Sequence, residues 1–212
     1  EAVPNERGIP MSLRQLSALS MLACTLSIPG VTSAADLSVG GQIRPGGACD
    51  ITLGNGGVAD FGNLSRKDLY GADHMRDVSL TINCQRRTRV GVDLIDNRKG
   101  TASEDHPWNF GLGNRAIGYY RIVNFGPSMV DGAASVSIWR WKGETTWREK
   151  GRTYSWGSNK TISWDVSGPQ SEPVAFKTLT DTLTIELITK QDTAFTDELA
   201  FDGSATLELV YL

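Results

Sequence analysis

The sequence lacks the short motifs by which many enzymes are recognised. It contains no Gly-x-Ser-x-Gly, no His-Glu-x-x-His and no phosphate-binding glycine loop. The two histidines, His74 and His106, stand alone in polar segments without the spacing of metal ligands, so no metal site is expected. Because no set of catalytic groups can be assembled, the sequence favours a protein that is not an enzyme and that uses no cofactor.

The sequence also lacks an excess of positive charge and any long apolar run. Its formal net charge is -3, whereas nucleic acids and anionic membranes are bound by clustered basic surfaces. We therefore expect no nucleic-acid partner. The longest apolar stretch is shorter than the roughly 20 residues that span a bilayer, so no stable membrane insertion is expected either.

The first 34 residues predict export. Residues 1–10 are polar and patternless and are taken as an unstructured extension or a mis-called start. Residues 11–34 combine Arg14, an apolar body, a Pro29-Gly30 break and a small-residue exit, which is the pattern of a secretory signal peptide. A helix of the mature domain and a lipoprotein signal at Cys24 are the alternatives. Cleavage near Ala34 would leave residues 35–212 as one exported domain.

Cysteine is scarce, and its positions fit an exported domain. Removal of the leader leaves Cys49 and Cys84, and an even pair in an oxidising compartment predicts a disulfide. Each cysteine extends the inward row of an expected strand, so the bridge is expected to lie buried between two sheets. It closes a loop of about 35 residues, which corresponds to roughly 3.5–4 kcal/mol of stabilisation.

Helical periodicity is missing from the mature chain, and alternation of apolar and polar residues takes its place. The alternating segments are separated by glycine-rich turns, and the polar run 85–89 is expected to be a connection. This pattern predicts an all-β fold, an immunoglobulin-like β-sandwich with one disulfide. The expected strands are 37–43, 49–53, 78–84, 90–94, 117–125, 136–141, 161–166, 183–187 and 205–212.

Tryptophan is the exception to an otherwise ordinary composition. Six are present, and five of them fall between Trp139 and Trp164. Trp139 and Trp141 share a strand face and Trp147 follows a turn, so an exposed aromatic platform that stacks on a host glycan is one interpretation. The other is that these rings fill the core or cover the end of a sheet, since aromatic residues favour strands.

Two alternating segments lie at the two ends of the expected domain. Leu37, Val39 and Ile43 belong to the first, and the second carries Leu207, Leu209 and Tyr211. An edge strand with unpaired backbone groups invites pairing with another chain. The sequence therefore favours a protein that pairs its strands with those of other proteins.

The last segment, residues 204–212, resembles the C-terminal strand of chaperone–usher pilins, with alternating apolar residues and a penultimate tyrosine. Further segments are similar to a group of fimbrial-like proteins from Gram-negative bacteria, described as a domain of unknown function or as proposed β-fimbria subunits. The likeness runs from about Leu37 to Leu212. Its segments are Asp96-Asn97-Arg98-x-Gly100-Thr101, Phe110-Gly111-Leu112-Gly113, Ile117-Gly118-Tyr119-Tyr120, Pro173-Val174-Ala175-Phe176 and Asp202-Gly203-Ser204-Ala205-Thr206.

The resemblance implies a pilin-type sandwich that is missing its last strand. A periplasmic chaperone lends a strand, and the N-terminal extension of the next subunit replaces it in the fibre. Leu207, Leu209 and Tyr211 would line the groove, and Leu37, Val39 and Ile43 would supply the donated strand. The implied partners are the chaperone, the usher and other fimbrial subunits, and the implied location is a surface fimbria or the extracellular medium, reached through the periplasm.

Two functions follow from these expectations. The first is a structural subunit of a bacterial surface fimbria, assembled by strand exchange. The alternative is a carbohydrate-binding adhesin or tip protein that uses Trp139, Trp141 and Trp147.

Overall fold

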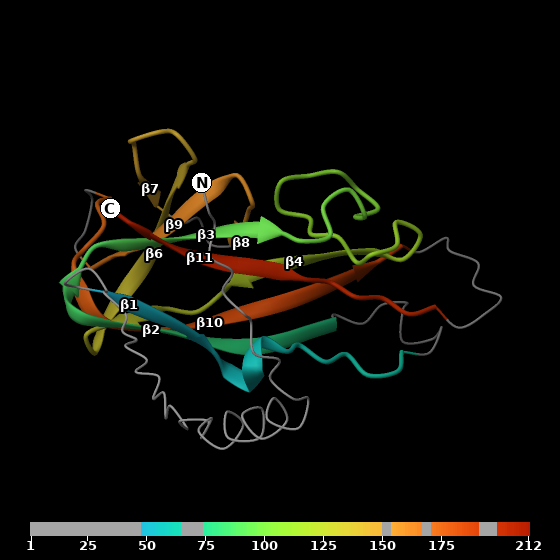
Figure 1. Ribbon diagram of the computed structural model, residues 1–212, viewed down its shortest axis with the longest axis horizontal. Coiled ribbons are helices and arrows are strands. Elements are labelled where there is room, and N and C mark those ends of the chain that lie inside the picture. The colour runs from blue at the N-terminus through green and yellow to red at the C-terminus, as the bar shows by residue number, and fades with distance from the viewer. Residues whose placement is uncertain (1–47, 65–73, 150–153, 167–170, 191–198) are drawn as a thin grey trace, which may run out of the picture. The chain divides into compact units, whose positions relative to one another are not determined.

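The structure is a computed structural model that describes residues 48–64, 74–149, 154–166, 171–190 and 199–212 (Figure 1). The chain divides into two units, Glu1–Ile43 and Arg44–Leu212, and all described residues belong to the second. Apart from one short 3-10 turn at Gly54–Gly57, every regular element among them is a strand. The predicted all-β fold is therefore confirmed. The predicted signal peptide and the candidate donor residues Leu37, Val39 and Ile43 lie outside the described residues.

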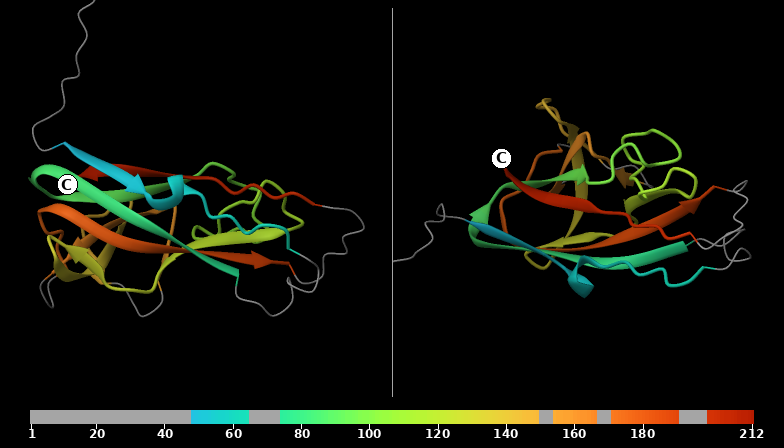
Figure 2. Two further views of the ribbon diagram at one scale, coloured as in Figure 1. Left: turned by 90° about the horizontal axis from the view of Figure 1, so that it is seen from below. Right: turned by 45° about the vertical axis from the view of Figure 1, so that its right-hand side comes forward.

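The strands form two sheets that face each other as a sandwich (Figure 2). The first sheet contains β1 (Cys49–Leu53), β2 (His74–Thr88), β4 (Gly118–Asn124), β5 (Ser128–Val130), β8 (Tyr154–Trp156) and β10 (Phe176–Thr189). The second contains β3 (Val90–Asp96), β6 (Ala133–Trp141), β7 (Arg148–Glu149), β9 (Lys160–Asp165) and β11 (Ala205–Tyr211). All of these pairings are antiparallel.

The two sheets are connected along one side only, among the described residues. There β5 pairs with β10 in the first sheet and with β6, which in turn pairs with β9 in the second. We call this the closed side. At the two ends of the strand order, within the described ranges, β1 pairs only with β2, and β11 pairs only with β3. We call the region between β1 and β11 the open side.

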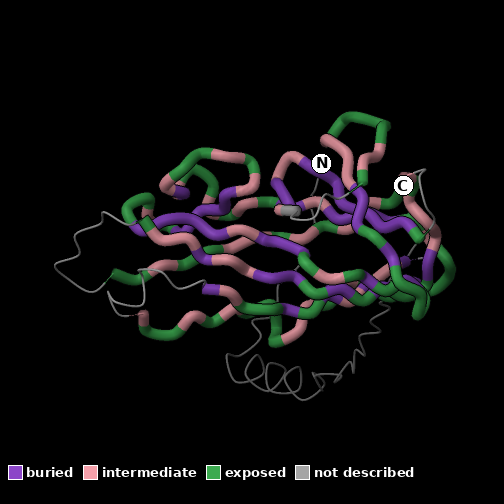
Figure 3. The backbone as a smooth tube through the Cα atoms, turned by 180° about the vertical axis from the view of Figure 1, so that it is seen from behind, coloured by how far each residue is buried: buried purple, intermediate pink, exposed green. Residues whose placement is uncertain are grey.

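Alternating apolar residues build the core between the sheets. Leu80 and Ile82 of β2 and Val90, Val92 and Leu94 of β3 are fully buried, as their period of two requires. Burying each such side chain contributes about 1.5–3 kcal/mol. Figure 3 shows that buried segments are concentrated in the central strands, while the connections are largely exposed.

A buried polar cluster holds the closed side together. Asp181 of β10 occupies an inward position, and its carboxylate accepts hydrogen bonds from Ser128 Oγ at 2.7 Å and Trp164 Nε1 at 3.1 Å. The Thr182 N–H and the Asn124 side-chain amide also donate to it. A buried carboxylate with four donors is well satisfied, so the cluster fixes how these strands meet.

Two expectations about this part of the fold were wrong. The polar run 85–89 is not a loop, because β2 continues to Thr88 and only Arg89 separates it from β3. The disulfide Cys49–Cys84 exists, but it joins neighbouring strands of one sheet rather than two sheets. Cys49 lies directly opposite Cys84 in the β1–β2 register, with their Cα atoms 3.9 Å apart. Inward-facing cysteines can pair either between adjacent strands of one sheet or between two facing sheets. The alternation of apolar residues does not distinguish these two arrangements.

Candidate strand-binding site

Both edge strands of the open side carry inward side chains that are incompletely covered. On β1, Cys49, Ile51 and Leu53 are half-buried. Their neighbours on β2, such as Leu80 opposite Leu53 and Ile82 opposite Ile51, are fully buried. The inward row of β1 is therefore covered on the β2 side and less covered towards β11.

The same asymmetry occurs on β11. Its inward residues Ala205, Leu207 and Leu209 are half-buried. Leu94 opposite Leu207 and Val92 opposite Leu209 are fully buried. The incomplete burial is thus a property of the open side and not of one strand.

The backbone of β11 presents alternate amide groups to the open side. The Asn97 N–H donates to the Ser204 carbonyl at 3.0 Å, and the Leu212 N–H donates to the Arg89 carbonyl at 3.1 Å. In an antiparallel ladder the hydrogen-bonded and non-hydrogen-bonded residues alternate. The even-numbered residues therefore bond to β3, and the groups of the odd-numbered residues point away from it. These are Ala205, Leu207, Leu209 and Tyr211.

The same argument applies to β1. The Gln85 N–H donates to the Ala48 carbonyl at 3.1 Å, which makes Ala48 and Gln85 a hydrogen-bonded pair. By alternation, the backbone groups of Cys49, Ile51 and Leu53 point away from β2. The two edges thus offer backbone donors and acceptors to the space between them.

An apolar cavity of about 960 Å³ opens beneath this space. Leu53 of β1 and Leu207 of β11 contribute to its two walls. Its floor is the inner face of the first sheet, where Ile185 is only half-buried although Leu183 and Leu187 on either side of it are buried. Other lining residues are Val78, Leu112, Ile117, Tyr120, Ile122 and the segments 57–64 and 199–205.

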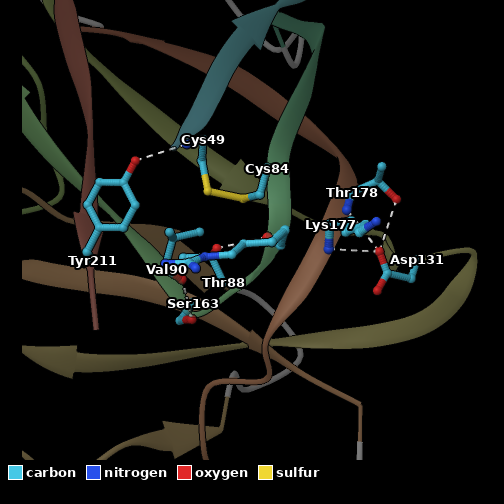
Figure 4. The surroundings of a disulfide bond; sticks show 10 residues. Cys49, Cys84, Thr88, Val90, Asp131, Ser163, Lys177, Thr178 and Tyr211 are labelled. Carbon is cyan, nitrogen blue, oxygen red and sulfur yellow. Dashed lines mark hydrogen bonds between the residues drawn. A yellow bond between two sulfur atoms is a disulfide. The ribbon is translucent and has the colours of Figure 1, made fainter. Parts of the chain in front are cut away.

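Side chains bridge the open side at both ends. At one end, the Cys49 N–H donates to the Tyr211 hydroxyl at 2.9 Å. Figure 4 shows the Tyr211 ring reaching from β11 to β1 beside the disulfide. At the other end, the rings of Phe61 and Phe201 lie 6.4 Å apart between centroids. We call the region between these two contacts the slot.

The segment that leads into β11 is held by residues that are far apart in the sequence. Arg98 forms an ion pair with Asp202, and the Asp202 N–H donates to the Leu112 carbonyl at 3.1 Å. The Asn97 amide donates to Ser204 Oγ at 3.0 Å. Because Gly203 also lies against Tyr120, four of the five segments that carried the family resemblance meet at this end of the slot.

Gly203 lies against the ring of Tyr120 within this arrangement. A Cβ atom at position 203 would lie 2.7 Å from the ring, so only glycine fits there. Tyr120 itself is buried and lines the cavity, and burial raises the pKa of its hydroxyl. Asp96 completes the arrangement, because its carboxylate accepts the N–H groups of Arg98 and Gly111.

The opposite wall of the slot is anchored to β2 by Arg76. Its guanidinium lies 5.1 Å from the centre of the Phe61 ring, and its Nε donates to the Asp60 carbonyl at 2.9 Å. Sequence reasoning missed this contact and the Phe61–Phe201 pair. Phe61 and Phe201 both fall outside the alternating segments, so no periodic signal marks them.

The predicted groove residues lie on one strand but play different parts. Leu207 lines the cavity, and Leu209 packs against the core next to it. Tyr211 does not line the cavity; it is half exposed and closes the end of the slot.

The predicted tryptophan platform is divided between two faces of β6. The rings of Trp139 and Trp141 are in contact, with centroids 4.9 Å apart. Trp147 instead lies against Arg140, whose Cζ is 4.8 Å from its ring centre, and Arg140 points to the opposite face of the strand. The structure therefore brings together two of the three residues, and the glycan platform stays a prediction.

A buried lysine covers the two tryptophans that do meet. Lys160 Nζ lies 4.3 Å from the Trp139 ring centre, 5.0 Å from that of Trp141 and 5.6 Å from that of Trp108. Lys160 is 5% exposed, and its burial lowers its pKa to about 8. The cluster is thus a set of cation–π contacts within the protein.

In the described part of the chain, no group of three or more His, Cys, Asp or Glu side chains is placed to hold a metal ion. Within the same ranges, no helix has the length and apolar character needed to cross a membrane.

Residues 37–116 match a family described as "Protein of unknown function (DUF1120)". The match includes β1, β2 and β3 and ends before β4, so it covers less than half of the chain. No curated protein matches the chain.

Proposed function

We propose that this chain is a structural subunit of a bacterial surface fimbria and that it assembles by accepting a strand from another protein. The proposal rests on one observation. The inward rows of β1 and β11 are half-buried, and Leu53 of β1 and Ala205 and Leu207 of β11 line the same apolar cavity. These two edge strands are not paired with each other in the described ranges.

An inserted β-strand fits both the backbone and the cavity. Its amides would pair with the outward groups of Leu207 and Leu209 on β11 and of Ile51 on β1. Its alternate side chains would enter the cavity between the sheets. Main-chain hydrogen bonds would supply affinity, and the cavity would select apolar side chains at every second position.

The resemblance to chaperone–usher pilins suggests who donates the strand. A periplasmic chaperone would occupy the slot before assembly, and a neighbouring subunit would occupy it in the fibre. Leu37, Val39 and Ile43 of a second copy have the required alternation. On this proposal the protein is exported through the periplasm, acts at the cell surface and has no catalytic role.

The test is co-expression with a periplasmic pilus chaperone, using two variants of neighbouring residues on β11. Leu207→Asn places an amide in the cavity, and Glu208→Asn places the same group on the exposed face. We expect Glu208→Asn to co-purify with the chaperone as the unmodified chain does, and Leu207→Asn to lose the complex. The proposal would be contradicted if both variants co-purified with the chaperone equally well, or if the unmodified chain were a stable monomer that does not bind the chaperone.

A further inference from the structure

Side chains close the slot at both ends, whereas its middle is open, and this difference limits the length of a strand that the slot can bind. At one end, the Tyr211 hydroxyl accepts the Cys49 N–H. That N–H points away from β2, into the position where an inserted strand would place a carbonyl. The Tyr211 side chain therefore already occupies the place of an incoming backbone group.

The opposite end is closed by apolar contact. The rings of Phe61 and Phe201 project from opposite walls of the slot and contact each other. Arg76 lies over the Phe61 ring, and Asp202, the residue after Phe201, forms an ion pair with Arg98. Both rings are half-buried and pack against the core. An incoming strand that continued beyond Ala205 would have to separate them.

From these two closures we infer that the slot selects strands by length and register, with Tyr211 as the stop at one end and the Phe61–Phe201 pair as the stop at the other. Between the stops, only Ala205, Leu207 and Leu209 of β11 present backbone groups to an inserted strand. Three such positions correspond to a paired segment of about five residues. The inference rests on the proposed function, because it concerns the strand that this function requires.

The partner chemistry follows from the same limits. The best occupant is a short extended segment with apolar or small side chains at three alternate positions, as in Leu37, Val39 and Gly41. Residues beyond its ends leave the slot, so they can be polar or bulky.

The experiment uses a chain in which a copy of residues 36–44 is joined to Leu212 through a flexible linker, so that a strand is always available to the slot. Backbone amide hydrogen exchange is measured residue by residue with and without this added strand. We expect protection to increase about tenfold or more at Leu207 and Leu209, and not at Tyr211.

Two substitutions at Tyr211 locate the stop. Tyr211→Ala removes the ring, so protection should extend to residue 211 and to Cys49. Tyr211→Phe keeps the ring and loses only the hydroxyl, so the boundary should remain after Leu209. A third variant, Phe61→Ala, should move the other boundary from Ala205 to Gly203.

The outcomes separate this inference from the function on which it rests. Protection that already includes Tyr211 in the unsubstituted chain, or boundaries that none of the variants moves, would overturn the length limit and leave strand binding intact. No gain of protection at Leu207 and Leu209 would overturn both.

Discussion

The closed and open sides of this sandwich are built from similar alternating strands, but backbone pairing connects the two sheets only on the closed side within the described residues. On the closed side, β5 and β6 carry the backbone pairing from one sheet to the other, and Asp181 gathers four donors beneath them. On the open side, β1 and β11 approach without pairing, and their inward rows are half-buried. The difference shows that incomplete burial here is local: the fold is complete wherever β5 and β6 connect the sheets.

The largest effect is expected on the closed side, from Asp181→Ala. The substitution leaves the buried donors of Ser128, Trp164 and Asn124 without their acceptor. Each buried donor left unsatisfied costs about 1–3 kcal/mol, so we expect the free energy of unfolding to fall by about 3 kcal/mol or more. Chemical denaturation followed by tryptophan fluorescence measures it, with the exposed neighbour Thr180→Ala as a control expected to change little. A small effect of Asp181→Ala would mean that the closed side does not depend on this cluster.

A matched pair of leucines compares core and edge directly. Leu94 and Leu207 lie opposite each other on β3 and β11, but only Leu94 is fully buried. We expect Leu94→Ala to cost about 3 kcal/mol or more and Leu207→Ala about 1 kcal/mol, because the cavity beside Leu207 already exists. Equal losses in the free chain would show that the open side is as well packed as the core. With a strand in the slot, the cost of Leu207→Ala should rise.

Because Lys160 is buried, we expect the free energy of unfolding to depend on pH. Its pKa is lowered to about 8 in the folded chain, whereas an unfolded lysine titrates near 10.4. Above pH 8 the unfolded state therefore binds more protons than the folded state, and stability contributed through Lys160 should rise as the pH increases from about 8. Denaturation midpoints at pH 7.5 to 9.5 should show this rise in the unmodified chain, and Lys160→Met should reduce it. If the midpoints of Lys160→Met rose with pH as steeply as those of the unmodified chain, a group other than Lys160 would cause the dependence.

The smallest effect is expected from Tyr211→Phe at the open side. It removes the hydroxyl that accepts the Cys49 N–H and keeps the ring. The loss should be about 0.5–1.5 kcal/mol, the usual contribution of one hydrogen bond. Amide exchange at Cys49 should accelerate, while exchange at fully buried Ile82 on the next strand serves as the control. A loss as large as that of Asp181→Ala would show that the Tyr211 hydroxyl does more than accept this one hydrogen bond.

Period-two alternation predicted what depends on local sequence. It predicted the last strand, with Ala205, Leu207 and Leu209 on one face, and the row Cys49, Ile51 and Leu53 on another strand, and both are confirmed. It failed at β2, because a strand that extends past the core can be polar, as Arg86 and Arg87 are. The short strands β5, β7 and β8 are too brief to show a period at all.

The contacts that shape the slot could not be predicted in this way. Arg98 with Asp202 and Gly203 with Tyr120 join segments that are about 80–100 residues apart, and such pairings leave no periodic trace in one sequence. On the closed side, by contrast, one signal was available. Asp181 stands between Leu179 and Leu183 in an inward row, and a carboxylate in such a position is normally held by several donors.

The central claim is that the odd-numbered backbone groups of β11 await a strand from another protein. Residue-resolved amide hydrogen exchange on the free chain and on its complex with the chaperone tests this claim most directly. The account predicts that Leu207 and Leu209 exchange much faster than Glu208 and Val210 in the free chain, and that all four are slow in the complex. Slow exchange at Leu207 and Leu209 in the free chain would show that the protein already pairs this edge itself, which would contradict the account.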